Sequence, residues 1–344
     1  MTETDERTHS SQHGDAVISV ERVKKYFPIK KGFLSSIVAG ENIFVKAVDD
    51  VSFYVRKGEV FGLAGESGSG KTTTGRLLLR LTDVTDGKVY FKGMDITKLS
   101  QRQLKPLRKE MQIIFQDPYE SLDPRMSIKE IVAEPLRIQG IARTEDEIDE
   151  RVKKILTEVE IVPPEEFMWR FPHELSGGQR QRVAVARAFV VDPEFVVADE
   201  PVSMLDVSIR AEVLNAMLEL VQKRQVSFIY ITHDLALAKH VCDRIAIMYL
   251  GKIVEMGPTE QVIDNPLHPY TQALIAAIPV PDPSYRRGDL PISGEIPSPL
   301  NPPMACRFHT RCPYAFQECT EAEPPLVELE PGHWAACHMV RKYQ

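Results

Sequence analysis

A glycine-rich segment carries the residue types that bind phosphate. Residues 65–72, Gly-Glu-Ser-Gly-Ser-Gly-Lys-Thr, satisfy the pattern G-x-x-x-x-G-K-S/T in full. In such a loop the glycines let backbone N–H groups converge on a β-phosphate, and the positive end of the following helix adds to the attraction. Lys71 would bridge the β- and γ-phosphates, and the Thr72 hydroxyl would bind Mg²⁺. A glycine-rich turn without a ligand is the alternative, and the complete motif between a strand and a helix disfavours it.

Two acidic residues follow an apolar segment farther along the chain. Asp199 and Glu200 come directly after Phe195–Ala198, which has the composition of a buried strand. The first acid can hold the water shell of Mg²⁺, and the second can polarise a water molecule for attack on a γ-phosphate. Two acids after a strand can also cap a helix. Their combination with the glycine-rich loop favours nucleotide hydrolysis.

A second anion-binding turn precedes the arginine-rich helical segment Arg180–Phe189. The turn consists of Leu175, Ser176, Gly177, Gly178 and Gln179. A Ser-Gly-Gly turn that opens a helix points backbone N–H groups at an anion, although such a motif alone is equally consistent with a helix cap. Because one nucleotide has no use for two γ-phosphate cradles in one chain, we expect this turn to contact the nucleotide of another subunit.

The elements that must position these residues alternate between strands and helices. Buried strands are expected at Val60–Ala64, Phe195–Ala198 and Phe228–Ile231, because these segments are uniformly apolar. Helices are expected at Thr72–Arg80 and Ile209–Lys223. This alternation is typical of a parallel sheet covered on both faces.

Other segments indicate additional subdomains. Val17–Val20 and Ala47–Val55 alternate between apolar and polar residues, which predicts antiparallel strands with a solvated face. Residues 30–42 are expected to form an insertion loop, and residues 128–170, which are charged and helix-forming, a helical insertion. Residues 279–303 hold 8 prolines and predict an extended linker.

Composition excludes several function classes. The chain has 344 residues, with 43% hydrophobic and 26% charged residues, as in a globular protein of one or two domains. A net charge of −7, from 42 basic and 49 acidic residues, disfavours a protein that coats nucleic acid. No apolar stretch approaches the roughly 18–20 residues that span a bilayer, and Met1–Asp15 lacks the apolar core of a secretory signal. A membrane role would therefore require partner chains.

The combination of motifs resembles that of the ATP-binding cassette (ABC) ATPases. In this resemblance Gln116 corresponds to the Q-loop glutamine, Asp206 to the D-loop aspartate and His233 to the switch histidine. Phe27 corresponds to the aromatic residue that stacks on adenine, with Tyr26 as the second choice.

The resemblance implies a complete set of site residues. ATP binding is implied for Phe27, Gly65, Glu66, Ser67, Gly68, Ser69, Gly70, Lys71, Thr72, Thr73 and Asp199. Mg²⁺ binding is implied for Thr72, Gln116 and Asp199, and catalysis of hydrolysis for Glu200, His233 and Gln116. The signature turn at 175–179 would act in trans, across a head-to-tail pair of ATPase subunits.

Three further segments narrow the resemblance to the ATPases of oligopeptide/dipeptide importers. They are Phe115–Pro124, His268–Leu274 and Gly294–Pro299, and the insertion at residues 30–42 is similar to that of the F-type ATPase of the pair. The resemblance implies a peripheral ATPase at the cytoplasmic face of the membrane. Its implied partners are a second, non-identical ATPase, two transmembrane permeases and an extracytoplasmic substrate-binding protein, and no nucleic acid.

Other functions stay open at this point. Importers of nickel share these signatures, so a nickel or other small-solute importer is the first alternative. A soluble ABC ATPase of translation or DNA repair is the second, although such proteins usually carry two cassettes or a long coiled coil. A metal-binding regulatory protein without turnover is disfavoured by the intact Glu200 and His233.

Four cysteines lie close to the C-terminus: Cys306, Cys312, Cys319 and Cys337. In a reducing compartment such clustering favours metal ligation over disulfides, but none of the spacings is a C-x-x-C pair. A 4Fe–4S cluster, zinc aided by nearby histidines (His309, His333, His338), and plain thiols are the hypotheses. The resemblance implies the cluster, because some importer ATPases of this family carry one at a similar motif. We expect a structural or redox-sensing role, since this segment is far along the chain from the nucleotide motifs.

The predicted fold class is α/β. It has a P-loop ABC ATPase core with a parallel sheet, an antiparallel β subdomain and a helical subdomain, followed by a small Cys-containing C-terminal domain. We expect a disordered tail at residues 1–15 and the nucleotide-binding domain at 16–278, with the helical subdomain at about 117–190. Residues 279–344 are expected to form the proline-rich linker and a four-cysteine regulatory region.

Overall fold

The computed structural model describes residues 15–29, 43–278, 292, 294–295, 297–300 and 302–342. The predicted insertion at 30–42, most of the predicted tail at 1–15 and most of the predicted linker lie outside these residues. Two compact units make up the fold. Unit 1 takes its described residues from Met1–Ser19, Tyr54–Val60 and Tyr90–Ile231, and unit 2 from Val20–Phe53, Phe61–Val89 and Thr232–Gln344.

Unit 1 contains three parallel strands. They are β6 (Met111–Ile114), β7 (Phe195–Asp199) and β8 (Ser227–Thr232). β7 pairs with β6 and β8 in parallel, and every residue of β7 and β8 is buried, which confirms the two predicted buried strands. Because the strands are parallel, their carboxyl ends meet at one edge, where Asp199 ends β7 and Gln116 and Glu200 follow their strands.

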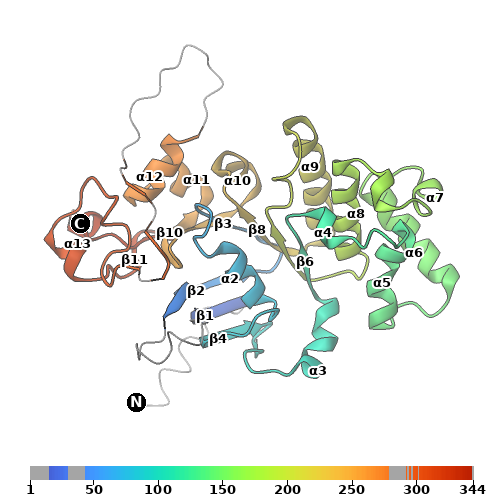
Figure 1. Cartoon of the computed structure of the whole chain (residues 1–344), viewed down its shortest axis with the longest axis horizontal. Helices are drawn as coiled ribbons and strands as arrows, with labels where there is room; N and C mark the ends of the chain where they lie inside the picture. The colour runs from blue at the N-terminus through green and yellow to red at the C-terminus, as the bar shows by residue number, and fades with distance from the viewer. Residues whose placement is uncertain are drawn as a thin grey trace, which may run out of the picture. The chain divides into compact units, whose positions relative to one another are not determined.

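Most of the rest of unit 1 is helical, and the helices at 128–139, 145–158 and 164–167 confirm that the predicted insertion at 128–170 is helical. The helices of this unit are α3 (Gln101–Leu104), α4 (Pro118–Ser121), α5 (Ile128–Gln139), α6 (Glu145–Glu158), α7 (Pro164–Phe167), α8 (Gly177–Phe189) and α9 (Val207–Arg224). α5 to α8 are the green and yellow-green helices of Figure 1. α5 and α6 both begin with a capping box, built on Ser127 and Thr144. Each such cap contributes about 1 kcal/mol to helix stability.

Unit 2 contains a sheet that includes strands from the C-terminal region. Apart from Val60, β3 (Val60–Ala64) belongs to this unit and pairs in parallel with β9 (Arg244–Tyr249). β9 pairs with β10 (Lys252–Pro258) antiparallel, β10 with β12 (His333–Ala335), and β12 with β11 (Val327–Glu330). The C-terminal strands therefore extend the sheet that carries the glycine-rich loop, a pairing that the sequence analysis did not predict.

Three longer strands confirm the predicted antiparallel subdomain as sheet structure. They are β1 (Ala16–Pro28), β2 (Phe44–Arg56) and β4 (Asp86–Phe91), most of whose residues belong to unit 2, where their order is β2-β1-β4. In unit 1 the end of β4 pairs with the two-residue strand β5 (Met94–Asp95). The Phe53 ring on β2 stacks on Phe61 of β3, with 5.0 Å between ring centroids.

The helices of unit 2 are short. They are α2 (Lys71–Leu78), α10 (Leu235–Val241), α11 (Thr259–Asp264), α12 (Pro269–Ala276), α13 (Gln317–Glu321) and α14 (His338–Lys342). α2 is the helix predicted after the glycine-rich loop. Across the described part of the chain, no helix combines the length and the apolar character that crossing a membrane requires.

Candidate functional site

The phosphate loop of unit 2, residues 65–70, joins β3 to α2. Gly65 and Gly70 both have positive φ, +146° and +108°. A Cβ on Gly65 would overlap the carbonyl oxygen of Met248, and one on Gly70 would overlap that of Ala47. Only glycine fits at these two positions, because the loop passes directly against neighbouring backbone. The close approach of neighbouring backbone therefore explains why the motif has glycine at positions 65 and 70.

Lys71 lies at the first position of α2 and is only 5% exposed. Its ammonium donates to the carbonyl oxygens of Gly65, at 2.7 Å, and of Glu66, at 3.0 Å. The ammonium thus lies inside the loop, at the positive end of a helix. A buried cation in this position attracts an anion such as a nucleotide phosphate.

Residues of the C-terminal region contact this loop, and the sequence analysis missed them. The Tyr270 hydroxyl accepts a hydrogen bond from the backbone N–H of Glu66, at 2.9 Å. Arg311 donates two hydrogen bonds to the Glu66 carboxylate, at 2.8 and 3.2 Å. Distance along the chain therefore does not separate Arg311 from the nucleotide motifs in space, while the expected structural or redox-sensing role of the four-cysteine region stays a prediction. The signal available in the sequence was the carboxylate of Glu66 within an anion-binding loop, because such a charge requires a cationic partner.

In unit 1 the structure brings together Gln116, Glu200 and Ser203. Asp199 ends β7 and is 6% exposed, and Glu200 follows with a φ of +46°. The Gln116 side-chain amide donates to the Glu200 carboxylate at 3.3 Å and to the Ser203 hydroxyl at 3.4 Å. The Ser203 hydroxyl donates in turn to the carbonyl oxygen of Glu200, at 3.0 Å. A non-glycine residue with positive φ is costly, and such strain concentrates at functional sites.

The signature turn opens α8 through a capping box. Ser176 accepts a hydrogen bond from the backbone N–H of Gln179, and the Gln179 side chain accepts one from the backbone N–H of Ser176. The helix-cap interpretation is therefore correct for the local structure. A Cβ on Gly178 would come within 2.5 Å of Ile209 on α9, so this glycine also permits close packing of the two helices. Ser176 itself is exposed.

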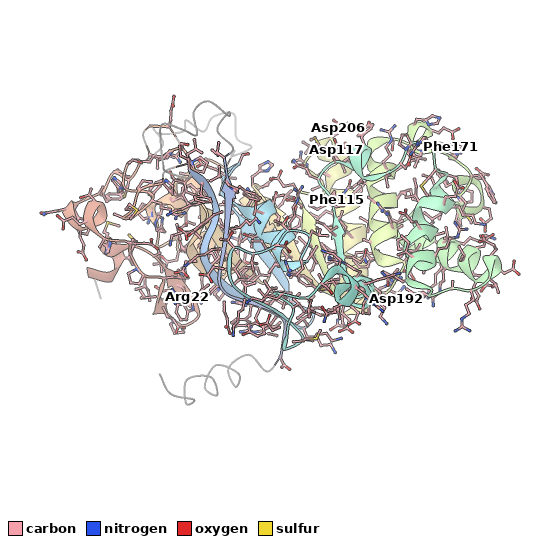
Figure 2. The ribbon with its side chains drawn as sticks, turned by 60° about the horizontal axis from the view of Figure 1, so that its bottom comes forward. Arg22, Phe115, Asp117, Phe171, Asp192 and Asp206 are labelled. Atoms are coloured by element: carbon pink, nitrogen blue, oxygen red, sulfur yellow. The ribbon has the colours of Figure 1, made fainter. Side chains whose placement is uncertain are left out.

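The other predicted site residues divide between the units. In unit 1 Phe115 and Asp117, on either side of Gln116, follow β6, and the exposed Asp206 precedes α9 (Figure 2). In unit 2 His233 is exposed. Phe27 is 39% exposed, with the Lys25 ammonium 4.9 Å from its ring centroid.

Tyr26 is held differently from Phe27. Its hydroxyl donates to the Asp49 carboxylate at 2.5 Å, and burial raises its pKa. Its ring is therefore fixed by a partner within the protein, whereas the Phe27 ring is the more exposed of the two.

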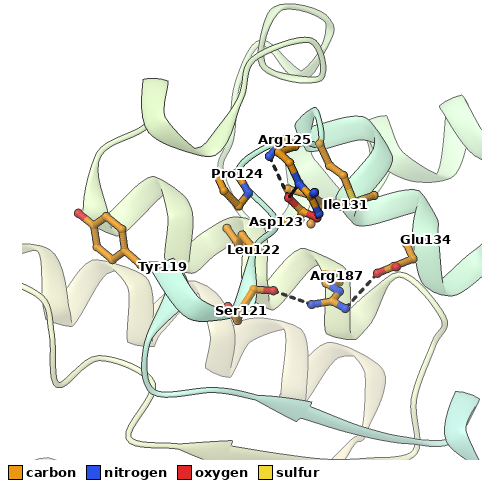
Figure 3. Close-up of a pocket in the computed structure, with 10 residues that line it drawn as sticks. Tyr119, Ser121, Leu122, Asp123, Pro124, Arg125, Ile131, Glu134 and Arg187 are labelled. Carbon is orange, nitrogen blue, oxygen red and sulfur yellow. Dashed lines mark hydrogen bonds and ion pairs between the residues drawn. The ribbon is translucent and has the colours of Figure 1, made fainter.

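A cavity of about 560 Å³ lies in unit 1 (Figure 3). It is lined by Tyr119, Ser121, Leu122, Asp123, Pro124, Arg125, Met126, Ile131, Glu134 and Arg187. Arg187 connects its two sides, because it donates to the carbonyl oxygen of Ser121 at 2.8 Å and to the Glu134 carboxylate at 3.0 Å. The lining thus combines fixed charges with exposed apolar surface, such as the 65% exposed Tyr119.

The four C-terminal cysteines belong to unit 2. Burial, with smaller contributions from the charges of Cys319, Cys337 and Cys312, raises the pKa of Cys306 to about 12. Burial also raises the pKa of Cys312 and Cys337. Four thiols within electrostatic reach of one another have the donor chemistry of a thiolate-ligated metal. The described residues nevertheless contain no group of three or more His, Cys, Asp or Glu side chains arranged to hold a metal ion.

Comparison with known proteins identifies the family. Residues 48–203 match the model of the ABC transporter family, and residues 254–319 match the oligopeptide/dipeptide transporter C-terminal region. The oligopeptide transport ATP-binding protein AppF of Bacillus subtilis (strain 168) is 46% identical over 328 residues, which cover 94% of this chain and 98% of that protein.

Solved structures agree with this assignment. The dimeric post-hydrolysis state of the ATP-binding cassette MJ0796, bound to ADP and Pi, has a TM-score of 0.61 at 27% identity, covering 70% of this chain and 98% of that one. CbiO1 from Clostridium perfringens, part of the ABC transporter complex cbiONQ, has a TM-score of 0.61 at 25% identity, covering 73% and 92%. The chain therefore belongs to the ABC ATPases. Within them it belongs to the group with the oligopeptide/dipeptide transporter C-terminal region, and it is an ATPase with the P-loop fold predicted for it.

Proposed function

We propose that this chain hydrolyses ATP to energise peptide import by an ABC transporter, as one of two ATPase subunits. The contact of Gln116 with Glu200 in unit 1, together with the intact phosphate-loop sequence of unit 2, carries the hydrolytic part of the proposal. The match of residues 254–319 to the oligopeptide/dipeptide transporter region supports peptides as the cargo. Import of nickel or another small solute is the alternative, and transport assays distinguish them.

In this proposal one set of site residues binds ATP and Mg²⁺, and Glu200 takes part in proton transfer. The backbone of residues 65–73, with Lys71, would hold the phosphates, and the Phe27 ring would stack on adenine. Thr72, Gln116 and Asp199 offer a hydroxyl, an amide oxygen and a carboxylate to Mg²⁺, which neutralises phosphate charge when bound. Glu200 would accept a proton from the attacking water, and the Gln116 amide would hold its carboxylate in place. His233 would contact the γ-phosphate.

The exposed Ser176 of the signature turn supports an arrangement of two ATPases head to tail. Residues 175–179 would cover the ATP of the second ATPase, whose own signature turn would cover the ATP on Lys71, and Asp206 would lie at the same interface. Hydrogen bonds to a charged γ-phosphate contribute roughly 1.5–3 kcal/mol each and disappear with ADP. This difference would close the pair with ATP and open it after hydrolysis.

The cavity of Figure 3 is our candidate for the permease contact. Its volume, the exposed Tyr119 ring and the charges of Asp123, Arg125 and Glu134 suit the end of a cytoplasmic helix. Docking of one of the two permease subunits there would hold the chain at the cytoplasmic face of the membrane as a peripheral protein. An extracytoplasmic substrate-binding protein would complete the importer.

The 4Fe–4S cluster remains a proposal for Cys306, Cys312, Cys319 and Cys337. The mutual electrostatic influence of the four thiols supports it, although the described side chains are not arranged as a metal site. Anaerobic purification should then give a brown protein with about four irons per chain. A colourless protein without iron or zinc after anaerobic reconstitution would leave these residues as ordinary thiols.

Glu200→Gln tests the proposed function. In the transporter assembled with its partner ATPase and permeases, we expect ATP hydrolysis and peptide uptake to fall at least about 100-fold, because the general base is lost. ATP binding should persist, since the phosphate loop is unchanged. Near-normal turnover would reject Glu200 as the base, and uptake of nickel but not of peptides by the unmodified transporter would reject the cargo.

A further inference from the structure

The phosphate loop contains a carboxylate whose negative charge disfavours the binding of a nucleotide phosphate. The loop must attract a triphosphate, and Glu66 places a negative charge within it, next to Ser67. Like charges at short range weaken binding unless a cation neutralises one of them. The cation is Arg311, which comes from a segment 245 residues farther along the chain.

The Arg311–Glu66 ion pair has the paired geometry of a strong interaction. Each of the two terminal nitrogens of Arg311 faces a different oxygen of Glu66, at 2.8 and 3.2 Å. Parallel pairing of this kind fixes orientation as well as charge. The Arg311 side chain is 7% exposed and that of Glu66 26%, so solvent screens the pair less than an exposed one.

Aromatic residues hold Arg311 in place. Its guanidinium lies 5.8 Å from the ring centroid of Tyr249 and 6.0 Å from that of Phe308. Tyr249, Tyr270 and Phe308 are all fully buried and contact one another, with ring centroids 4.7 to 5.5 Å apart. Tyr270 also accepts the hydrogen bond from the Glu66 backbone N–H. Arg311, which lies against this aromatic cluster, therefore binds the carboxylate of Glu66, and Tyr270, a member of the cluster, binds its backbone N–H.

A second arginine anchors the same turn. Arg307, four residues before Arg311, is 6% exposed and donates to the Leu250 carbonyl oxygen and the Asp49 carboxylate. Asp49 lies on β2 and accepts the hydrogen bond of the Tyr26 hydroxyl. The turn is thus fixed at both ends before any nucleotide binds, which lowers the cost of holding the loop in one conformation.

We infer that Arg311 is a positioning residue for nucleotide binding: it neutralises Glu66 and, together with Tyr270, holds the phosphate loop in its binding conformation. The inference rests on the proposed function only in that the loop binds ATP. Because the contact is made to the protein and not to the reacting atoms, it should affect bound ATP and the transition state equally. Its loss should raise KM and leave kcat nearly unchanged.

The experiment measures the ATP dissociation constant of the full-length chain by calorimetric titration. Arg311→Met keeps much of the side-chain volume and removes the charge, and we expect it to weaken ATP binding about tenfold. Arg311→Lys keeps the charge without the paired geometry and should give an intermediate value. The effect of Arg311→Met should shrink in high salt, which screens Glu66 from the phosphates. Lys239→Met, which removes the exposed Lys239–Asp264 ion pair of the same unit, is the matched control and should change binding less than about twofold.

A double-mutant cycle with Glu66→Gln separates positioning from a merely structural role. If Arg311 acts through Glu66, Arg311→Met in the Glu66→Gln background should weaken binding less than about threefold. An undiminished tenfold loss in that background would overturn the inference, as would an unchanged dissociation constant for Arg311→Met alone. If Arg311→Met does not fold, the same comparison is made with Arg311→Lys. Absence of ATP binding by the unmodified chain would instead reject the proposed function.

Discussion

Glu255 provides the sharpest test of how the C-terminal region is held. This carboxylate is fully buried on β10 and accepts three hydrogen bonds. The donors are the backbone N–H of Leu267, at 2.8 Å, the backbone N–H of His268, at 2.9 Å, and Nε2 of His333, at 2.8 Å. In Glu255→Gln one oxygen becomes an NH₂ group, so at least one buried donor faces another donor.

The expected cost follows from these contacts. A hydrogen bond to a charged group contributes roughly 1.5–3 kcal/mol, and a buried donor left unpaired costs roughly 1–3 kcal/mol. The lower desolvation cost of a neutral amide offsets part of this loss, so we expect Glu255→Gln to lower the free energy of unfolding by about 2–4 kcal/mol. That is a large share of the roughly 5–15 kcal/mol that stabilises a typical domain.

Trp334 on β12 reports on this region directly, because it lies next to His333. The chain has 2 tryptophans, and Trp169 is 63% exposed, so Trp169→Phe leaves Trp334 as the single reporter. In urea the Trp334 transition of Glu255→Gln should move down by about 1–2 M. Glu260→Gln, which neutralises an exposed acid of α11, is the control and should shift it little. A free energy of unfolding within about 0.5 kcal/mol of the unmodified value would refute the reasoning.

Three further predictions concern both units. Ser176→Arg should abolish most ATP hydrolysis by the assembled transporter and leave ATP binding by the isolated chain intact, and an unchanged hydrolysis rate would reject the trans arrangement. Gly178→Ala should destabilise the packing of α8 against α9 by about 1–3 kcal/mol in a denaturation experiment, because the added methyl group meets Ile209. Burial lowers the pKa of His268 to about 4, so protonation favours the unfolded chain and stability falls as pH drops from about 6.5 towards 4. His268→Asn keeps a side-chain acceptor for the backbone N–H of Tyr270. We expect the free energy of unfolding of this variant to fall by about 2 kcal/mol less between pH 7 and pH 5 than that of the unmodified chain. Identical dependence of the two unfolding free energies on pH would contradict this prediction.

The parts of the fold that were predictable from the sequence are local. The loop at residues 65–72 and the strand before Asp199 each combine a motif with the apolar pattern of the element that carries it, and the structure confirms those elements. The helical insertion was predictable for the same reason, since its capping residues and apolar faces lie within single segments. The assigned roles of Gln116, Glu200 and His233 remain predictions.

What could not be predicted depends on pairing between distant segments. β12 has only three residues, and its pairing with β10 has no local signal that separates it from an irregular tail. The Arg311–Glu66 contact likewise joins residues that belong to no common motif. Only the Arg311–Glu66 contact had a signal in the sequence, because the Glu66 carboxylate within a phosphate loop requires a cationic partner.

The contacts of Glu66 imply that C-terminal docking and nucleotide binding are thermodynamically linked. The docked turn neutralises Glu66, so the docked state should bind ATP more tightly than the undocked state. Linkage then requires that bound ATP stabilise docking by the same factor. A tenfold difference in ATP affinity corresponds to about 1.4 kcal/mol, so saturating ATP should shift the equilibrium between the docked and the undocked turn by about that much, in addition to its stabilisation of the folded chain as a whole. The Arg311→Met variant should lose this increment, because without the arginine the docked turn no longer neutralises Glu66 and the docked and undocked states bind ATP equally well.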